Sequence, residues 1–547
     1  MNKHADFGVL YGQKTTEDAL LIYSSYEDAK ASPQTGDFIV LTPKDEGSTK
    51  FLARVEAEIY DEDPIFKSQD KTLIAVHYAR IAERELSERD KQKMFSYTYK
   101  VRILGTYTDT GTAISFTTAV RKLPTVSYIA RHLNKREIDA ILNKSNEDGA
   151  AIGHLCIGET VFQDKGPILF KINKLRDKRT MIFAQSGFGK TNLVKVLLSN
   201  MMSDTTYGKL IFDLNGEYFL RGTKTYGLGD VEDKTVRENV VVYTDKKLPV
   251  QYEGTKRFVH KGKVLLNMHQ HLTVGDILNF GGAFSEVMRA FLLYLDEEGV
   301  SDFIQKIDGY VANPGDLHKD FPNFFDQKKE ASARTTIASI RKRIKHLIDE
   351  GKGLHLNSSR LVEDVFQYLK QGKTVIIDLS LKDNLDASII STILVRKLFD
   401  NNKANFTSDK PGDVINTVVF VEEAQNVLSE EFVKSNANPF VRVAKEGRKF
   451  GLGLVAITQR PSAISEEIRT QAENFFAFHM GNSDDIRALV KSNVNYDGVI
   501  SNFIQRETIP GNLYMVSSDQ AFALPVRVSE FEKLIGSKVY SESKFLT

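Results

Sequence analysis

Short apolar runs separated by turn-forming residues characterise the first part of the chain. Within one of these runs every second position is apolar: Phe51, Ala53, Val55, Ala57 and Ile59. A period of two predicts a strand with one buried face. Gly, Pro, Asp and Ser separate this run from similar ones, "GDFIVLTP" and "FSYTYKVRILGTYTD". We therefore predict a small β-barrel over residues 1–125, interrupted over 79–95 by a charged surface helix or loop.

A different pattern begins near residue 151, after a predicted short helical connector over residues 126–150. Apolar runs, most of them followed by a helical pattern, recur from here on: "TMIFA", "KLIFDL", "NVVVYT", "TVIIDL", "TVVFVE", "GLVAIT" and "NFFAFHM". Nearly continuous apolar strands that alternate with helices are typical of a parallel sheet covered by helices on both faces. We therefore predict an α/β core in two parts, over residues 151–273 and 371–530.

The two parts of this core are separated by residues 274–370, where helical patterns replace the alternation. One predicted helix there gathers its apolar residues on a single face: Ile337, Ile340, Ile344, Leu347 and Ile348. We interpret this stretch as a helical insertion. After Ile509 the sequence predicts a final hairpin. We expect residues 531–547 to form a C-terminal tail.

Charge and cysteine content narrow the class of protein. The 547 residues suffice for about three or four structural units. Lys and Arg number 73 and Asp and Glu 72, so contact with nucleic acid would require a local basic lining. The single cysteine, Cys156, allows no intramolecular disulfide and fits a reducing compartment. The N-terminus lacks a signal-peptide pattern, and no apolar run approaches the roughly 20 residues that span a bilayer. We expect a cytoplasmic protein without membrane contact.

The stretch "AQSGFGKT" lies between a predicted strand and a predicted helix. In a phosphate-binding loop, backbone N–H groups surround an anion, a lysine reaches the β- and γ-phosphates and a hydroxyl binds Mg²⁺. Gly187 and Gly189 supply backbone freedom, Lys190 the charge and Thr191 the hydroxyl. Ala184 stands where the consensus has its first glycine, and its Cβ would disfavour a left-handed conformation there. The sequence predicts a phosphate site with a variant loop entry.

Acidic residues at the end of a buried strand are the second requirement of nucleotide hydrolysis. "TVVFVEEAQNVL" ends an apolar run in Glu422 and Glu423, and we expect Glu422 near the metal and Glu423 as the base that polarises the attacking water. "KLIFDLNGEY" offers a competing pair, Asp213 and Glu217. Spacing alone does not decide which pair supplies the base.

Basic and polar residues around the strand "LGLVAIT" form a third group. Gln459 at the end of this strand could sense the γ-phosphate. A basic residue of a neighbouring subunit could stabilise transition-state charge as an arginine finger, and the candidates on this stretch are Lys445, Arg448, Lys449 and Arg460. The alternative for each of them is a surface charge that complements a helix dipole.

These motifs together resemble those of the HerA family of hexameric DNA translocases. "IFDLNGEY" resembles the family's "DPHGEY" element, "FVEEAQN" its catalytic "EEAH" strand, and "KEGRKFGLGLVAITQRPS" its "EGRKFG…QRPS" signature. "TQRPS" also occurs in FtsK-type chromosome pumps, but "GEY" and "EGRKFG" favour HerA. The predicted N-terminal barrel occupies the position of the family's HAS barrel, and "LCIGETVFQDKGPILFKINKL" resembles the run-in to its ATPase core.

The resemblance implies an α/β fold with a RecA-like P-loop NTPase core, a parallel-rich central sheet, a HAS-like barrel and a helical insertion. It implies ATP and Mg²⁺ as cofactors, with Thr191 and Glu422 at the metal, Glu423 as catalytic base, Arg448 as a finger acting in trans and Gln459 as sensor. We expect the nucleotide to be bound by Ser186, Gly187, Phe188, Gly189, Lys190, Thr191 and Asn192, with Asp213 and Glu217 in the nucleotide or subunit-interface region. Asn215 and Gln425 replace histidines common in the family, so turnover could be altered.

The resemblance also implies a homohexameric ring that moves along double-stranded DNA with a partner nuclease or other effector, NurA-like, sirtuin-like or of another kind. The context would be DNA end processing or anti-phage defence. An alternative is an ATP-regulated ring that serves as an assembly platform for such an effector. A third is an ATPase unrelated to DNA.

Overall fold

The computed structural model describes most of the chain, and every structural statement below concerns these residues: 6–13, 20–25, 33–43, 49–61, 96–125, 128–219, 226–231, 238–247, 259–260, 262–280, 284–297, 303–312, 330–350, 353–407, 411–435, 438–518, 520 and 522–539. The chain divides into two compact units, which are described separately. Unit 1 comprises Met1–Lys171, Ala184–Gly189 and Phe475–Ser529, and unit 2 comprises Ile172–Phe183, Lys190–Asn474 and Glu530–Thr547.

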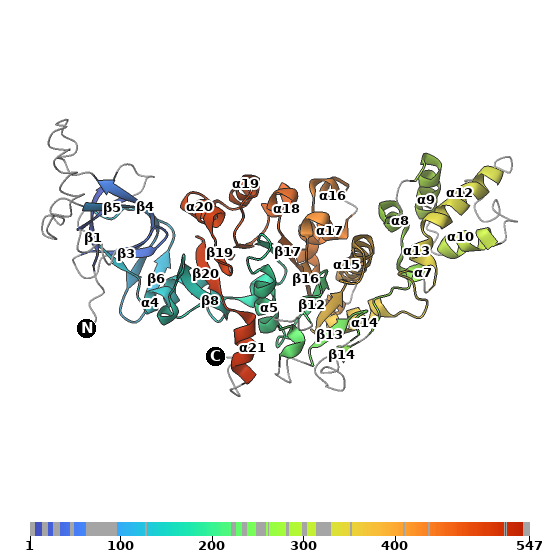
Figure 1. Cartoon of the computed structure of the whole chain (residues 1–547), viewed down its shortest axis with the longest axis horizontal. Coiled ribbons are helices and arrows are strands. Elements are labelled where there is room, and N and C mark those ends of the chain that lie inside the picture. The colour runs from blue at the N-terminus through green and yellow to red at the C-terminus, as the bar shows by residue number, and fades with distance from the viewer. Residues whose placement is uncertain are drawn as a thin grey trace, which may run out of the picture. The chain divides into compact units, whose positions relative to one another are not determined.

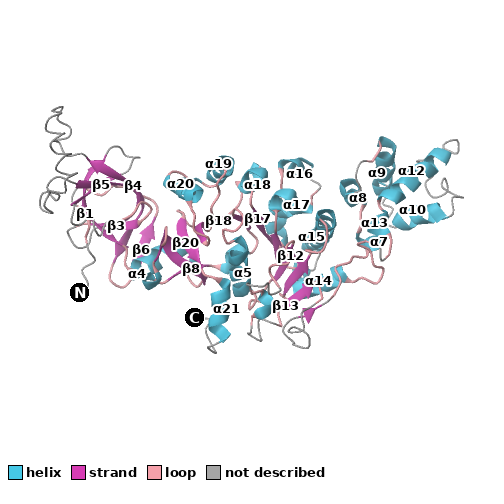
Figure 2. Ribbon diagram, in the orientation of Figure 1, coloured by secondary structure: helices cyan, strands magenta, loops and turns pink. Residues whose placement is uncertain are grey.

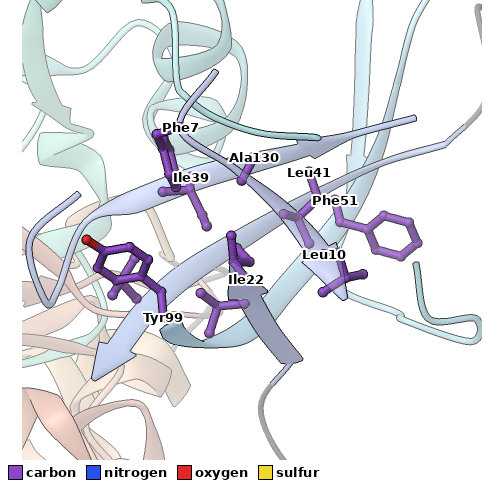
Figure 3. Packing of buried hydrophobic residues seen from close by; sticks show 11 residues of the cluster. Phe7, Leu10, Ile22, Ile39, Leu41, Phe51, Tyr99 and Ala130 are labelled. Carbon is purple, nitrogen blue, oxygen red and sulfur yellow. The ribbon is translucent and has the colours of Figure 1, made fainter. Parts of the chain in front are cut away.

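Unit 1 begins with a seven-stranded antiparallel sheet (Figure 1). Its strands are β1 (Gly8–Gln13), β2 (Leu20–Ser25), β3 (Phe38–Thr42), β4 (Lys50–Asp61), β5 (Ser96–Asp109), β6 (Ile114–Thr117) and β7 (Ile129–His132). Their order is β2-β1-β7-β3-β4-β5-β6, and β2 pairs with β5 as well as with β1. Phe7, Ile22, Ile39 and Tyr99 belong to the apolar core that these strands enclose (Figure 3).

Two expectations for this region need correction. The alternation in β4 predicted one buried face, but Leu52 and Arg54 are buried as well as Phe51, Ala53 and Val55. The second face is covered because this sheet packs on the C-terminal part of unit 1, where the rings of Phe38 and Phe522 lie 5.7 Å apart. Residues 126–150, predicted as a helical connector, include β7, since Ile129–His132 pairs with both β1 and β3; a short helix, Lys135–Glu137, follows. The charged interval 79–95 lies outside the described residues.

The rest of unit 1 is a second antiparallel ladder. Its strands are β8 (Ala150–Ile157), β9 (Thr160–Val161), β10 (Pro167–Phe170), β18 (Asn474–Ala477), β19 (Asn512–Val516) and β20 (Leu524–Val528). They follow the order β10-β8-β20-β19-β18, with β9 beside β8. The hairpin predicted after Ile509 is confirmed as β19 and β20. Helices α19 (Ser483–Ser492) and α20 (Val499–Arg506) connect β18 to β19.

Unit 2 contains a parallel sheet, as six of the apolar runs predicted; the seventh run, "NFFAFHM", instead forms β18 and pairs antiparallel with β19. Its strands are β11 (Arg179–Phe183), β12 (Gly208–Asp213), β13 (Val240–Tyr243), β14 (Val259–His260), β15 (Thr374–Asp378), β16 (Thr417–Val421) and β17 (Leu452–Thr458). The order β11-β17-β16-β12-β15-β13-β14 is parallel at every pairing. Helices α15 (Asn384–Thr407) and α17 (Pro439–Glu446) pack together on one side, with α5 (Lys190–Met201) on the other (Figure 2).

Most described residues of the stretch predicted as an insertion, 274–370, are helical. Its helices are α8 (Val274–Phe280), α9 (Glu286–Glu297), α10 (Phe303–Ala312), α12 (Glu330–Arg343), α13 (Lys345–Ile348) and α14 (Leu361–Lys370), and a short helix, α7 (Met268–His271), precedes them. The predicted apolar face is confirmed, because Ile337, Ile340, Ile344, Leu347 and Ile348 are all buried. The last helix of the stretch, α14, contacts β12 and β15. Residues 531–539 of the predicted tail form helix α21 (Phe531–Val539).

Among the described residues, we find no helix with the length and hydrophobicity that crossing a bilayer requires.

Candidate functional site

The carboxyl ends of the central strands of unit 2 meet at one edge of the sheet. Phe212 of β12 is aligned with Val421 of β16, and Phe183 of β11 with Thr458 of β17. Parallel strands in this register place the residues that follow each strand side by side. The residues after β12, the glutamates after β16 and Gln459 after β17 therefore share one edge of the unit 2 sheet.

The loop Ala184–Gly189, which links β11 to α5, is described with unit 1. Ala184 is buried and is not among the described non-glycine residues with positive φ, so its Cβ causes no backbone strain. Gly187 and Gly189 have φ of 85° and 102°, where glycine is favoured. The Phe188 carbonyl accepts a hydrogen bond from the Gly511 N–H (3.0 Å), and the Phe188 ring lies 4.4 Å from that of His479.

The first residues of α5 bring the predicted phosphate ligands to the glutamates. Lys190 Nζ lies 3.6 Å from Glu423 Oε1, with both side chains mostly buried. The Thr191 hydroxyl donates to Glu217 Oε2 at 2.8 Å. The Asn192 side chain points elsewhere: its Oδ1 accepts the backbone N–H of Phe531 (2.8 Å), at the first residue of α21. The structure thus brings Lys190 and Thr191 into the cluster and gives Asn192 a contact with the C-terminal helix.

Glu423 follows β16 in a left-handed conformation, with φ and ψ both 45°. Its carboxylate accepts hydrogen bonds from Gln425 Nε2 (2.7 Å) and Gln459 Nε2 (3.1 Å). Burial by itself raises the pKa of Glu423, but these two amides and the charge of Lys190 outweigh it and lower the pKa below its ordinary value. Glu423 is therefore ionised at neutral pH and can accept a proton.

Glu422 lies in a different environment and is only 5% exposed. Its carboxylate accepts hydrogen bonds from the Tyr218 hydroxyl (2.7 Å), the Leu214 N–H (3.2 Å) and Asn215 Nδ2 (3.5 Å). Burial, and next the charge of Asp213, raise the pKa of Glu422 to about 7. The two adjacent glutamates thus have opposite pKa shifts.

Asp213 anchors the turn that follows β12. Its carboxylate accepts the backbone N–H groups of Gly216 (2.7 Å), Glu217 (3.1 Å) and Tyr218 (3.0 Å). Burial raises the pKa of Asp213 to about 6. Because the aspartate is fully buried and its oxygens are bonded to this turn, it positions Glu217 and Tyr218 and is not exposed to a substrate.

Two residues that depart from the resembled motifs lie directly on the glutamates. Asn215 donates to Glu422 and Gln425 donates to Glu423. Gln425 is oriented in turn by the Thr458 hydroxyl, which donates to its Oε1 at 2.5 Å. Each amide therefore supplies a hydrogen bond to a carboxylate at this site.

Tyr218 is a site residue that the sequence reasoning did not single out. It is fully buried, and its hydroxyl joins the turn after β12 to the glutamate after β16. The available signal was its place in "NGEY", beside two acidic candidates, but a motif does not reveal which strand a buried hydroxyl reaches.

Arg448 does not join this cluster within the chain. It is exposed and lies in the turn Gly447–Phe450 that precedes β17, whereas Gln459 follows β17. At about 3.3 Å per residue, the length of β17 separates the two edges by about 20 Å. Of the other basic candidates, Lys445 is paired with Glu467 (2.9 Å).

The raised pKa of Glu422 predicts a pH dependence of stability. Its folded pKa lies above the ordinary 4.5, so the folded state holds this proton more tightly, and the associated stability is lost as the pH rises from about 4.5 through about 7. Glu422→Gln removes this titration. The melting temperature should therefore fall less between about pH 5 and about pH 8 in the variant than in the wild type. Over this range the variant should lose less unfolding free energy, by on the order of 2 kcal/mol. An equal difference in both proteins contradicts the raised pKa.

The Tyr218 hydrogen bond predicts a second difference in stability. Tyr218→Phe leaves Glu422 without its closest donor and should lower the melting temperature by a few degrees, equivalent to about 1.5–3 kcal/mol. Tyr207→Phe is the matched control, because Tyr207 is equally buried in unit 2 and its hydroxyl has no hydrogen-bond partner among the described residues. The control should change the unfolding free energy by less than about 0.5 kcal/mol. Equal effects of the two substitutions would contradict a role of the Tyr218 hydroxyl.

Two family models match the chain. The model described as "Helicase HerA, central domain" matches residues 155–398, which include the loop before α5, Asp213 and Glu217. The model described as "Zonular occludens toxin (Zot)" matches residues 333–484, which include Glu422, Glu423 and Gln459.

Similar proteins carry related names. The chain is 26% identical over 407 residues to the "DNA double-strand break repair helicase HerA" of Sulfurisphaera tokodaii, covering 72% of this chain and 73% of that protein. The protein of the same name from Saccharolobus solfataricus is 26% identical over 419 residues, covering 75% and 74%. Among solved structures, VirB4 of Thermoanaerobacter pseudethanolicus aligns with a TM-score of 0.42 and 13% identity, over 70% of this chain and 96% of that chain. From the HerA central-domain match and these HerA relatives, the chain is a HerA-like P-loop ATPase.

Proposed function

We propose that this ATPase is a homohexameric motor that moves along double-stranded DNA and works with a partner nuclease or other effector. The observation that supports its chemistry best is the position of Glu423. An ionised carboxylate is held by two amides, 3.6 Å from the lysine that begins α5. The HerA relatives, named as DNA double-strand break repair helicases, support DNA as the substrate of movement.

The side chains divide the chemical work as follows. Lys190 and the N–H groups of Ser186, Gly187, Phe188 and Gly189 bind the phosphates of ATP at the start of α5. Glu423 accepts the proton of the attacking water, and Gln459, already bonded to Glu423, senses the γ-phosphate. When ATP enters, its phosphates compete with Glu423 for Lys190, which leaves the carboxylate free for the water.

The residues beside Lys190 also fit Mg²⁺. The Thr191 hydroxyl and the Glu217 carboxylate are oxygen donors 2.8 Å apart, and Mg²⁺ in nucleotide sites typically takes few protein ligands besides phosphates and water. Glu422 would contact the ion through water, because its carboxylate already accepts hydrogen bonds from Tyr218, Leu214 and Asn215. Phosphate oxygens of the nucleotide would supply further ligands to the ion held by Thr191 and Glu217. The bound ion would neutralise charge on the phosphates.

The place of Arg448 supports a site completed by a neighbour. Arg448 is exposed at the edge of the sheet opposite Glu423 and cannot reach the phosphates bound by its own chain. In a ring, Arg448 of each subunit would reach the phosphates bound by the next subunit and act as an arginine finger. Such a finger raises turnover by orders of magnitude. We further propose that the N-terminal sheet is a HAS-like β-barrel, which the pairing of β2 with both β1 and β5 supports.

The alternative is a ring that mainly assembles and activates an effector, in DNA end processing or anti-phage defence. The exposed apolar residues Val287 and Leu293 on α9 favour it, because they give the helical stretch a surface that a partner could cover.

The test measures ATP hydrolysis by the isolated chain with and without duplex DNA. A motor should be stimulated severalfold by DNA alone. Lys190→Ala should abolish ATP binding or turnover, whereas Glu423→Gln should bind ATP and hydrolyse it at least about 100-fold more slowly. Full activity of Lys190→Ala would overturn the site. Activity that appears only with the effector supports the platform, and indifference to DNA with or without the effector supports an ATPase unrelated to DNA.

Mixed rings test Arg448 as a trans finger. Arg448→Ala and Lys190→Ala subunits are each inactive alone, but about a quarter of the interfaces in a random equal mixture join an intact Lys190 to an intact Arg448. Activity should therefore recover partly on mixing. Lys190→Ala mixed with Glu423→Gln is the control, because one chain supplies both residues to the same site and no intact site forms. Without recovery beyond this control at any mixing ratio, the trans assignment fails.

A further inference from the structure

A cavity of about 350 Å³ lies within unit 1, and neither the glutamates nor Lys190 is among the residues that line it. Its wall is formed by residues 34–36, the end of β8, α20, the segment that leads from α20 into β19, and one residue each of β19 and β20. The apolar side chains on this wall are Ile157, Ile500, Phe503, Ile509, Tyr514 and Pro525. This volume lies in the range of sites that hold small organic molecules.

The chemistry of the wall selects an uncharged aromatic ligand. The rings of Phe503 and Tyr514 are nearly parallel, at 18° with centroids 6.4 Å apart, and offer flat apolar surface. Three charged residues line the cavity: Glu159 and Arg506 are exposed to solvent, and Glu507 is buried. The Glu507 carboxylate accepts the N–H groups of Thr508 and Ile509, both at 3.0 Å, and Asn512 Nδ2 at 3.1 Å, so the buried charge is already hydrogen-bonded. A ligand would gain from burying apolar surface and would find no unpaired carboxylate at Glu507 to neutralise.

The same wall is hydrogen-bonded to the loop that leads into Lys190. Asn512 donates to both Glu507 and the Gly158 carbonyl (3.0 Å), so it links two sides of the cavity. Directly before it, the Gly511 N–H donates to the Phe188 carbonyl at 3.0 Å. A Cβ on Gly189 would lie 3.4 Å from Gly511 Cα, so the two backbones are in close contact. Ile509 on the cavity wall is thus two residues from Gly511, whose N–H is bonded to the phosphate-binding loop.

We propose that this cavity is an effector site for a small, uncharged aromatic molecule, and that its occupancy changes ATP turnover through the contact between Gly511 and Phe188. This role goes beyond DNA movement and does not depend on it. Two sites that are joined by one hydrogen-bonded segment have the physical connection that coupling requires. A ligand that holds the loop in its nucleotide-binding conformation would raise ATP turnover. A ligand that draws the loop away would lower it.

Indole is a suitable probe, because it is aromatic, uncharged and fluorescent, and the chain contains no tryptophan to interfere. Titration of the full chain should show saturable binding. Ile157→Phe places a larger side chain on the cavity wall and should weaken binding at least 10-fold. Ile129→Phe is the matched control, a half-buried isoleucine on strand β7 that does not line the cavity, and it should bind indole as the wild type does. Ile500→Phe repeats the test from a second wall position if Ile157→Phe fails to fold.

Indole at saturation should also change the ATPase rate or the KM for ATP at least about 5-fold in the wild type and in Ile129→Phe. It should have no such effect in the filled variants, Ile157→Phe and Ile500→Phe. Absence of saturable binding, or equal binding by the filled and control variants, overturns the site. Binding that leaves ATP turnover unchanged overturns the coupling. The binding measurement needs neither DNA nor ring assembly, so its outcome is separate from that of the motor proposal.

Discussion

The place of β16 between β12 and β17 decides the character of the site, because two adjacent glutamates leave its end in different directions. The left-handed backbone at Glu423, which costs a non-glycine residue roughly 1–2 kcal/mol, turns the chain at this point. Glu422 is directed to the turn after β12 and bonds Tyr218, whereas Glu423 is directed to Gln459 after β17 and to Lys190. One carboxylate is thereby buried with a raised pKa and the other is kept ionised. Strain of this kind is maintained where the surrounding contacts over-determine it, which is typical of functional sites.

The turn after β12 connects the two ends of this arrangement. Asp213 holds three consecutive N–H groups of the turn, and the turn carries Glu217 to Thr191 and Tyr218 to Glu422. A change at the Thr191 hydroxyl can therefore reach Glu422 through one short segment. In unit 1, Gly511 has a comparable place, since it joins the wall of a cavity to the loop before Lys190.

Much of the fold could be predicted because its signals are local. Continuous apolar runs identified six parallel strands of unit 2, and the period of the isoleucines over 337–348 identified a buried helical face. The predictions that needed correction depend on distant partners. Arg54 and Leu52 of β4 are buried because another part of unit 1 covers them, and Ile129–His132 is a strand because β1 and β3 lie on either side of it. Alternation in a sequence reports one covered face and says nothing of what covers the other.

The sequence by itself determined which chemistry is present: a glycine-rich loop before Lys190 and Thr191, paired carboxylates at strand ends, and Gln459 after a buried strand. Only the tertiary structure decided how the carboxylates differ, since a pKa depends on burial and on neighbours hundreds of residues away. It also decided that Asn192 contacts α21, that Tyr218 belongs to the site, and that Arg448 lies at the far edge of the sheet. Strand order and register place these side chains, and neither is encoded in the spacing of a motif.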